Sequence, residues 1–150
     1  MATSPTLHAP TMVEPSEHHV VHTIQTTLRI LFGVVPIVAG LDKFTDFLAN
    51  WTAYLNPLLL HLVPMTDQAF MHLVGVIEVI AGALVLAKPR LGGFVVMAWL
   101  LAIAAQLILW GRFLDIAVRD IVMALGGALT LARLTPYTDH LHYDTPHTAV

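Results

Sequence analysis

Glu78 is a carboxylate near the middle of the apolar stretch formed by residues 67–90. This stretch has the length and composition of a segment that crosses a bilayer. A charged side chain at membrane depth costs on the order of 3 kcal/mol or more unless a partner compensates it. The chemistry available to the chain therefore depends on which groups meet Glu78.

Six other polar residues lie on helix faces or at depths that suit such a network. They are Arg29, Lys43, Gln106, Asp115, Arg119 and Asp120. At 1.5 Å per residue, Glu78 lies roughly 13 Å and Arg119 roughly 7 Å below the outer edge of the membrane. Arg119 is thus the nearest cation in depth and is predicted to pair with Glu78. Lys43 lies at the edge itself and is expected to meet Asp115 or Asp120.

Three interpretations of this set of residues remain open. A buried ionic network can simply fix the register and orientation of the helices. The same groups can line a polar pocket for a ligand, or they can form a proton pathway. Spacing alone does not choose between them.

The composition excludes several other classes of function. Of the 150 residues, 57% are apolar and only 11% are charged, about half the charge of an ordinary soluble domain. The net charge of −3 and the lack of a basic patch exclude a nucleic-acid partner. The chain has no cysteine, which excludes iron–sulfur clusters, thiol redox chemistry and cysteine zinc sites. No catalytic triad, HExxH, P-loop or GxGxxG pattern occurs either, so we expect no intrinsic cofactor and no catalytic residue.

Apolar segments of about 20 residues position these polar groups. The spans are predicted at residues 23–47, 67–87, 91–110 and 114–134. Residues 51–65, with Pro57 and Pro64, are predicted to form a short helix on the membrane surface, because Trp51 and Tyr54 are aromatic residues typical of the interface. The expected fold is all-α, a bundle of four transmembrane helices with a short interfacial helix between the first and second spans.

The remaining parts of the chain are polar. Residues 1–22 are predicted to be a disordered or loosely docked arm, residues 23–134 the membrane domain, and residues 135–150 a polar tail that begins where Pro136 ends the last helix. The tight turn between the second and third spans contains Pro89.

The distribution of basic residues favours one orientation in the membrane. Arg29, Lys88, Arg90 and Arg133 belong to one side, and Lys43, Arg112 and Arg119 to the other. The positive-inside rule then places both termini in the cytoplasm, with the chain as a multi-pass protein of the plasma membrane, or inner membrane.

Histidines are frequent, with nine in the chain. His18, His19 and His22 are the candidate metal ligands, since His19 and His22 are three residues apart and share a helix face. The alternative, which we favour, is a tail that titrates near neutral pH without binding metal. Only His72 lies inside a span, whereas a bis-histidine haem needs two histidines at matched depth.

Three motifs resemble the DoxX family of small four-helix membrane proteins. They are LRILFGVVPIVAGLDKF at 28–44, GVIEVIAGALVL at 75–86 and RDIVMALGGALTL at 119–131. Their order and spacing cover about residues 25–134. The positions that match the family are Arg29, Gly40, Lys43, Glu78, Gly82, Arg119 and Asp120.

This resemblance implies a function in membrane redox systems. The family's namesake members are membrane subunits that accompany a quinol oxidase or a thiosulfate:quinone oxidoreductase. The leading expectation is a non-catalytic subunit or accessory protein of a quinone-linked redox complex, with the other subunits, or a second copy of the chain, as partners in the bilayer. A bound quinone, with Trp99 and Trp110 as aromatic walls and Gln106 or Arg119 as donor, is the candidate ligand. The alternatives are a protein that binds or transports a small molecule or lipid through a Glu/Arg pocket, and a membrane enzyme with Glu78 as base.

Overall fold

The computed structural model describes residues 15–57 and 64–143, and these residues form helices with no strand among them. In chain order the elements are α1 (Pro15–Asp42), the 3-10 turn η1 (Trp51–Tyr54), α3 (Asp67–Ala87), α4 (Pro89–Trp110), α5 (Leu114–Met123), the π-helical turn η2 (Ala124–Ala128) and α6 (Leu129–Tyr143). The all-α prediction is therefore confirmed.

Three of these helices are long and apolar enough to cross a membrane. They are His19–Asp42 within α1, together with α3 and α4. The chain is thus consistent with a membrane protein, and this also explains why many large apolar side chains of α1, α4 and α5 are exposed.

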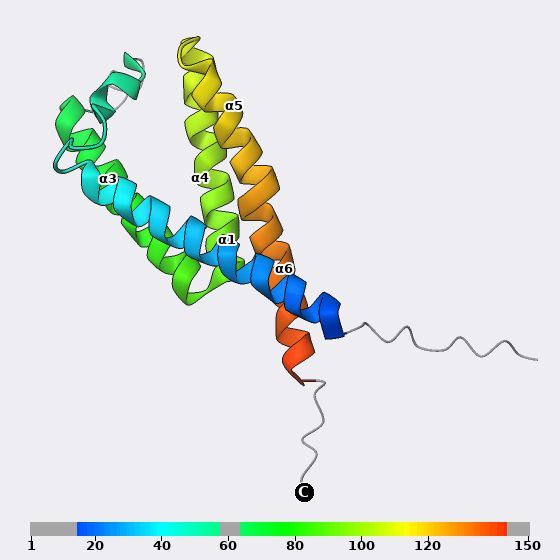
Figure 1. Cartoon of the computed structure of the whole chain (residues 1–150). Helices are drawn as coiled ribbons and strands as arrows, with labels where there is room; N and C mark the ends of the chain where they lie inside the picture. Colours follow the sequence, from blue (N-terminus) through cyan, green and yellow to red (C-terminus); the bar gives the residue numbers. More distant parts are fainter. Residues whose placement is uncertain (1–14, 58–63, 144–150) are drawn as a thin grey trace, which may run out of the picture.

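The last helical stretch is built differently from the first three. α5, η2 and α6 follow one another without a break, since the residues at both junctions, Ala124 and Leu129, have right-handed helical backbone angles. The three elements form one rod that runs from the α4–α5 turn to the C-terminal end of α6 (Figure 1). The π turn coincides with the place where the ring of Phe32 in α1 lies against Gly127.

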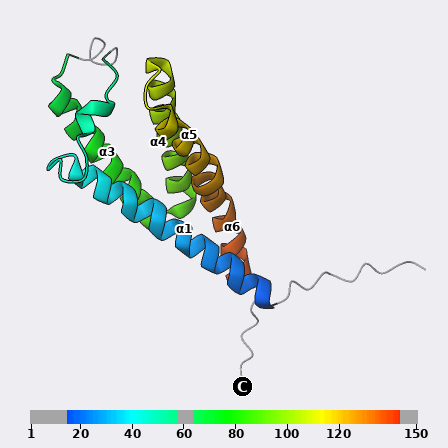
Figure 2. The same cartoon turned by 45° about the horizontal axis from the view of Figure 1, so that its top comes forward.

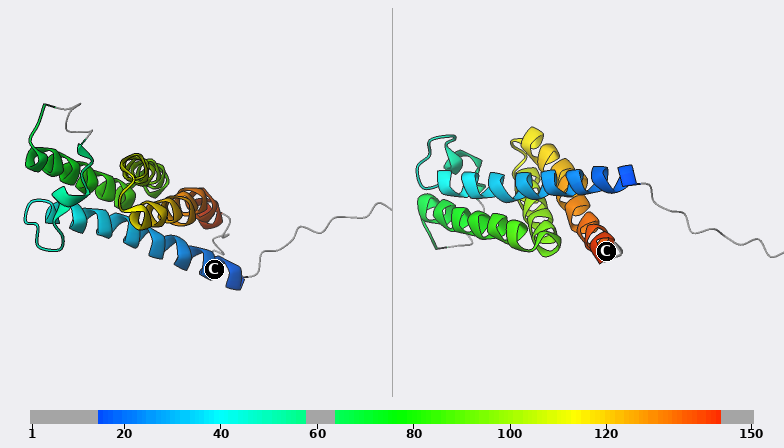
Figure 3. Two further views of the ribbon diagram at one scale, coloured as in Figure 1. Left: turned by 90° about the horizontal axis from the view of Figure 1, so that it is seen from above. Right: turned by 60° about the horizontal axis from the view of Figure 1, so that its bottom comes forward.

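The helices are arranged as two pairs. α1 runs beside α3, and α4 runs beside α5, and the two pairs diverge from the end of the molecule that holds the α3–α4 turn (Figures 1 and 2). α1 also crosses the rod formed by α5 and α6 (Figure 3). The start of α1, the α3–α4 turn and the end of α6 all lie in the lower part of the view in Figure 1.

Glycines allow α1 and α3 to approach closely. A Cβ atom on Gly40 would lie 2.5 Å from the carbonyl oxygen of Gly75, and one on Gly75 would lie 2.6 Å from the carbonyl oxygen of Gly40. About two turns away, a Cβ atom on Gly82 would meet the carbonyl oxygen of Gly33, and one on Gly33 would meet the side chain of Leu86. This packing through small residues is typical of membrane helices and fixes one antiparallel register.

Two apolar clusters hold the helices together. The first joins Ala81 and Val85 of α3, Val96 of α4 and Leu131 of α6, with Phe32 of α1 packed against it. The second lies between α4 and α5 and contains Ala104, Leu107 and Ala117.

The first helix begins and ends earlier than predicted. α1 begins at Pro15, inside the segment predicted as an arm, because proline is favourable in a first helical turn and no glycine or proline follows it before Gly33. It ends at Asp42, five residues before the predicted end of the first span at residue 47. Residues 1–14 of the predicted arm lie outside the described residues.

Pro136 does not end the last helix as predicted, because α6 continues to Tyr143. A proline removes one helical N–H donor and leaves a carbonyl in the preceding turn unpaired. Here the hydroxyl of Thr135 donates to the carbonyl of Leu131 (2.8 Å), and that of Thr138 donates to the carbonyl of Thr135 (2.9 Å). These hydroxyls supply donors within the turns around the proline.

Between α1 and α3, the structure shows the turn η1 at the start of the predicted interfacial segment. Residues 58–63 of that segment, and residues 144–150 of the predicted tail, lie outside the described residues.

Candidate functional site

The partner of Glu78 is Lys43. The Nζ atom of Lys43 lies 2.6 Å from Oε2 of Glu78, and the two side chains are only 4% and 10% exposed. α1 ends just before Lys43, so its long side chain can reach along α3 to a residue inside that helix. Gly75, one turn before Glu78, makes room for this arm, because a Cβ there would lie 3.2 Å from Cβ of Lys43.

An aromatic ring covers the pair. The Nζ atom of Lys43 lies 3.7 Å from the ring centroid of Trp51, the first residue of η1. A desolvated cation over an indole ring is stabilised by about 2 kcal/mol. The indole Nε1 of Trp51 also donates a hydrogen bond to Asp42 (2.7 Å), which holds the ring in place.

Asp42 organises the chain that leaves α1. Its carboxylate accepts hydrogen bonds from the backbone N–H groups of Phe47 and Leu48, from the hydroxyl of Thr45 and from Trp51. These donors turn the chain back over the end of α1, which explains why the helix stops at Asp42. This role was not predicted from the sequence, although Asp is a residue type whose side chain often accepts hydrogen bonds from the backbone of a following turn.

The predicted pairing of Glu78 with Arg119 is wrong. The side chain of Arg119 is 64% exposed, and its nearest carboxylate is that of its neighbour Asp120, at 3.7 Å. The expectation that Lys43 meets Asp115 or Asp120 is also wrong, because Lys43 pairs with Glu78. Lys43 follows α1, which packs closely on α3 where Glu78 lies, whereas α5 packs mainly on α4.

Asp120 is the second buried carboxylate of the region. Its side chain is 6% exposed, and its nearest cation is Arg119. Asp115, one helical turn and a residue earlier on α5, is exposed. Of the predicted set, the structure therefore pairs Lys43 with Glu78 and places Arg119 beside Asp120.

Arg29 lies at the other end of the α1–α3 pair. Its Nε atom donates to the carbonyl oxygen of Leu86 (3.0 Å), and its Nη2 atom donates to the same oxygen. Because the last carbonyls of a helix have no partner within it, Arg29 satisfies the C-terminal turn of α3. This is a structural role at a distance from Glu78.

Gln106 connects the two helix pairs. Its side-chain Nε2 donates to the carbonyl of Tyr54 (3.3 Å), and Asn56 donates to the backbone carbonyl of Gln106 (3.4 Å). The ring of Tyr54 also packs edge-on against Phe113, with the centroids 4.9 Å apart. The segment that contains η1 therefore ties α4 and α5 to the side that carries the Lys43–Glu78 pair.

Three polar atoms are buried without a hydrogen-bond partner among the described residues. They are Nε2 of His72, Nε1 of Trp99 and Oε1 of Gln106. Trp99 and Gln106 are seven residues apart on α4 and therefore share a face. The ring of His72 is stacked on Phe44, with the centroids 4.8 Å apart.

The candidate metal ligands lie near the start of α1. His19 and His22 are exposed, and the side chain of His18 lies outside the described residues. Where side chains are described, no group of three histidine or acidic residues is placed to hold a metal ion.

Comparison of the chain with protein-family models, with curated proteins and with solved structures finds no match. The geometry of the site is therefore the basis for the functional argument.

Proposed function

We propose that the chain is a DoxX-like integral membrane protein that acts as a non-catalytic subunit or accessory protein of a quinone-linked redox complex. The observation that supports this most directly is the Lys43–Glu78 pair. The pair is buried and covered by Trp51, so its groups serve the packing of α1 on α3. A carboxylate held by an ammonium group at 2.6 Å is also a poor general base, which argues against an enzyme that uses Glu78 in this way.

The proposal includes a fourth span and an orientation. The rod of α5, η2 and α6 begins at Leu114, where the fourth span was predicted, and Val118, Val122 and Leu125 on it are exposed. Such a surface suits lipid or another membrane subunit. Both termini would lie in the cytoplasm with Lys88. η1 and the residues after it would lie at the opposite membrane surface.

The link to quinone chemistry comes from the three motifs that resemble the DoxX family. The residues that carry the resemblance include Arg29, Lys43, Glu78 and Asp120, and the structure gives the first three defined partners. In such a protein the redox centre belongs to another subunit, and this chain contributes the membrane scaffold.

Purification of the full chain in mild detergent, followed by proteomics and absorption spectroscopy, tests the proposal. We expect stoichiometric co-purification of a protein that carries a redox centre. A monomer that purifies without any such protein, in a detergent that keeps the chain folded, would refute the role as a subunit.

A second candidate is a protein that binds or transports a quinone or another small molecule. The buried atoms Nε1 of Trp99 and Oε1 of Gln106 favour it, since one can donate to and the other can accept from a polar head group. Solvent extraction and mass spectrometry of the purified protein test this candidate. We expect a bound quinone that is lost when Trp99 and Gln106 are replaced together by Phe and Leu; protein that contains no quinone would exclude it.

A further inference from the structure

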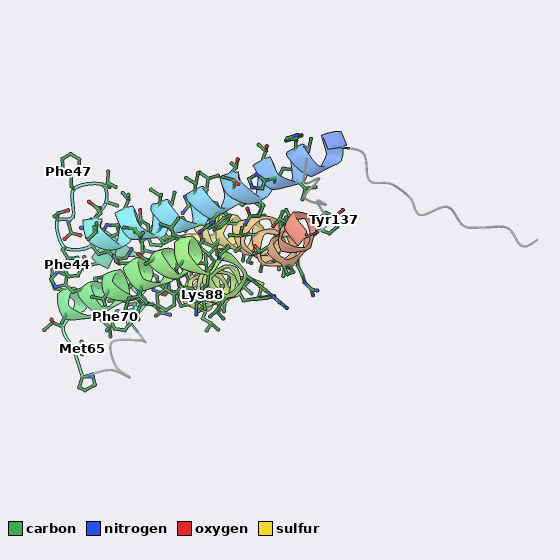
Figure 4. The ribbon with its side chains drawn as sticks, turned by 90° about the horizontal axis from the view of Figure 1, so that it is seen from below. Phe44, Phe47, Met65, Phe70, Lys88 and Tyr137 are labelled. Atoms are coloured by element: carbon green, nitrogen blue, oxygen red, sulfur yellow. The ribbon has the colours of Figure 1, made fainter. Side chains whose placement is uncertain are left out.

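A basic hollow lies beside the α3–α4 turn, far from the Lys43–Glu78 pair. It has a volume of about 360 Å³ and is lined by Lys88, Pro89, Arg90, Leu91 and Phe94, with Thr135 of α6 closing one side. Figure 4 shows Lys88 at this turn, at the end of the molecule that faces the viewer. The lining combines two cations with an apolar floor.

The two cations have no partner of opposite charge in the described part of the chain. Lys88 and Arg90 are exposed, and neither forms an ion pair or hydrogen bond there through its side chain. The acidic residues with described side chains lie elsewhere, within the helices or at their opposite ends. They are Asp42, Asp46, Asp67, Glu78, Asp115 and Asp120.

The backbone adds to the positive potential of the hollow. α4 begins at Pro89, and the residue before it, Lys88, does not cap the helix with its side chain. The N–H groups of the first turn carry a partial positive charge. The hollow and its two cations define the site. Pro89, the first residue of α4, lies between Lys88 and Arg90 in the chain.

The position of the hollow identifies the class of ligand. It lies where two candidate membrane spans meet, so its cations are at the level of the lipid head groups, and Leu91 (52% exposed) and Phe94 continue from it onto the apolar surface of α4. A phosphate would meet Lys88 and Arg90 while an acyl chain follows Leu91 and Phe94. Basic pockets between membrane spans suit anionic head groups.

We propose that this hollow binds the phosphate-bearing head group of an anionic phospholipid. The inference uses only the membrane-spanning character of α3 and α4 and goes beyond the role in a redox complex. If no redox partner is found, the lipid site is unaffected. If the lipid site fails, the search for a partner is unaffected.

The test compares variants of the full chain in neutral detergent micelles, where orientation in a membrane has no influence. Native mass spectrometry counts bound lipids and gives their affinities for phosphatidylglycerol and phosphatidylcholine. The variant Lys88→Gln/Arg90→Gln removes both cations. Arg112→Gln is the control, because Arg112 is an exposed cation at the other end of α4, near Trp110 and Phe113.

We expect one phosphatidylglycerol to bind more tightly than phosphatidylcholine. Each basic side chain near the phosphate contributes about five-fold in affinity, so the double variant should lose roughly 25-fold for phosphatidylglycerol and little for phosphatidylcholine. Lys88→Arg/Arg90→Lys, which keeps both charges, should bind within about three-fold of the unaltered chain, and Arg112→Gln within about two-fold.

Several outcomes would overturn the proposal. These are equal affinity for the two lipids, an equal loss in Arg112→Gln, or a loss in the charge-preserving variant as large as in the neutral one. Competition by inorganic phosphate at the concentration of the lipid would show a site for free phosphate instead, and this result too contradicts a lipid site.

Discussion

Replacing Lys43 by Met leaves the carboxylate of Glu78 buried without its cation. Both side chains are at least 90% buried, so solvent does little to screen the loss. Breaking a buried pair by removing one partner costs about 3–5 kcal/mol, in accord with the cost of about 3 kcal/mol for a lone charge at membrane depth. We expect Lys43→Met to lower the free energy of unfolding by about that amount.

The double variant Lys43→Met/Glu78→Leu separates the pair from the packing around it. An apolar pair of similar volume can replace a buried ion pair at little cost. The interaction with Trp51 is still lost, which costs on the order of 1–2 kcal/mol. We therefore expect the double variant to be less destabilised than Lys43→Met alone, by at least about 1 kcal/mol.

Denaturation with SDS in mixed micelles, followed by tryptophan fluorescence, measures these differences. Arg119→Met is the matched control, because Arg119 was the partner predicted from depth and its side chain is 64% exposed. It should cost less than about 1 kcal/mol. Two results would contradict the Lys43–Glu78 pairing. One is a loss of stability in Arg119→Met as large as in Lys43→Met. The other is a loss in the double variant equal to the sum of the losses in Lys43→Met and in Glu78→Leu measured singly.

Three further predictions use the same unfolding assay. Gly75→Ala should destabilise by about 1–3 kcal/mol, because its Cβ would meet the carbonyl oxygen of Gly40 at 2.6 Å, whereas Gly126→Ala has open space around the new Cβ and should be neutral or slightly stabilising; equal effects would contradict the close approach. Asp42→Ala should lower the stability and make residues 45–50 sensitive to added protease, because it removes the acceptor for several donors; unchanged proteolysis would count against the cap. Trp51→Phe should cost about 1–3 kcal/mol, since it keeps a ring over Lys43 and removes the indole donor to Asp42. A loss as large as that of Asp42→Ala would contradict the other hydrogen bonds to Asp42 as part of the cap.

Much of the secondary structure follows from the hydropathy of the sequence. The spans predicted at residues 67–87 and 91–110 match α3 and α4 to within two residues, because a long apolar run between a Thr and a Pro leaves little choice of helix ends. The errors occur at helix ends. Asp42 ends α1 early and α6 continues through Pro136, and hydropathy does not register either effect.

The partner of Glu78 could not be predicted from depth along the membrane normal alone. Depth along the membrane normal favours Arg119 over Lys43, because Lys43 lies at the outer edge. The choice depends on lateral adjacency, and the sequence does carry a signal for it. Gly33 and Gly40 on the first helix match the spacing of Gly75 and Gly82 on the next, so the two helices can pack at backbone distance in one antiparallel register. In that register Lys43 comes about one turn beyond the Gly40–Gly75 contact and Glu78 about one turn before it, so the long arm of Lys43 reaches back past Gly75 to the carboxylate.

The same register also bears on function. Arg29 and Lys43 lie at the two ends of the glycine contact, and both bind α3. Arg29 donates to the carbonyl of Leu86, and Lys43 donates to Glu78. Four of the family-like positions, Arg29, Gly40, Lys43 and Glu78, can therefore be explained by the assembly of two helices without a ligand. Asp120 and the unpartnered atoms on α4 are not explained in this way, because they lie on the other helix pair. If this chain binds a small molecule in the membrane, those groups, and not the Lys43–Glu78 pair, are where its contacts should be sought.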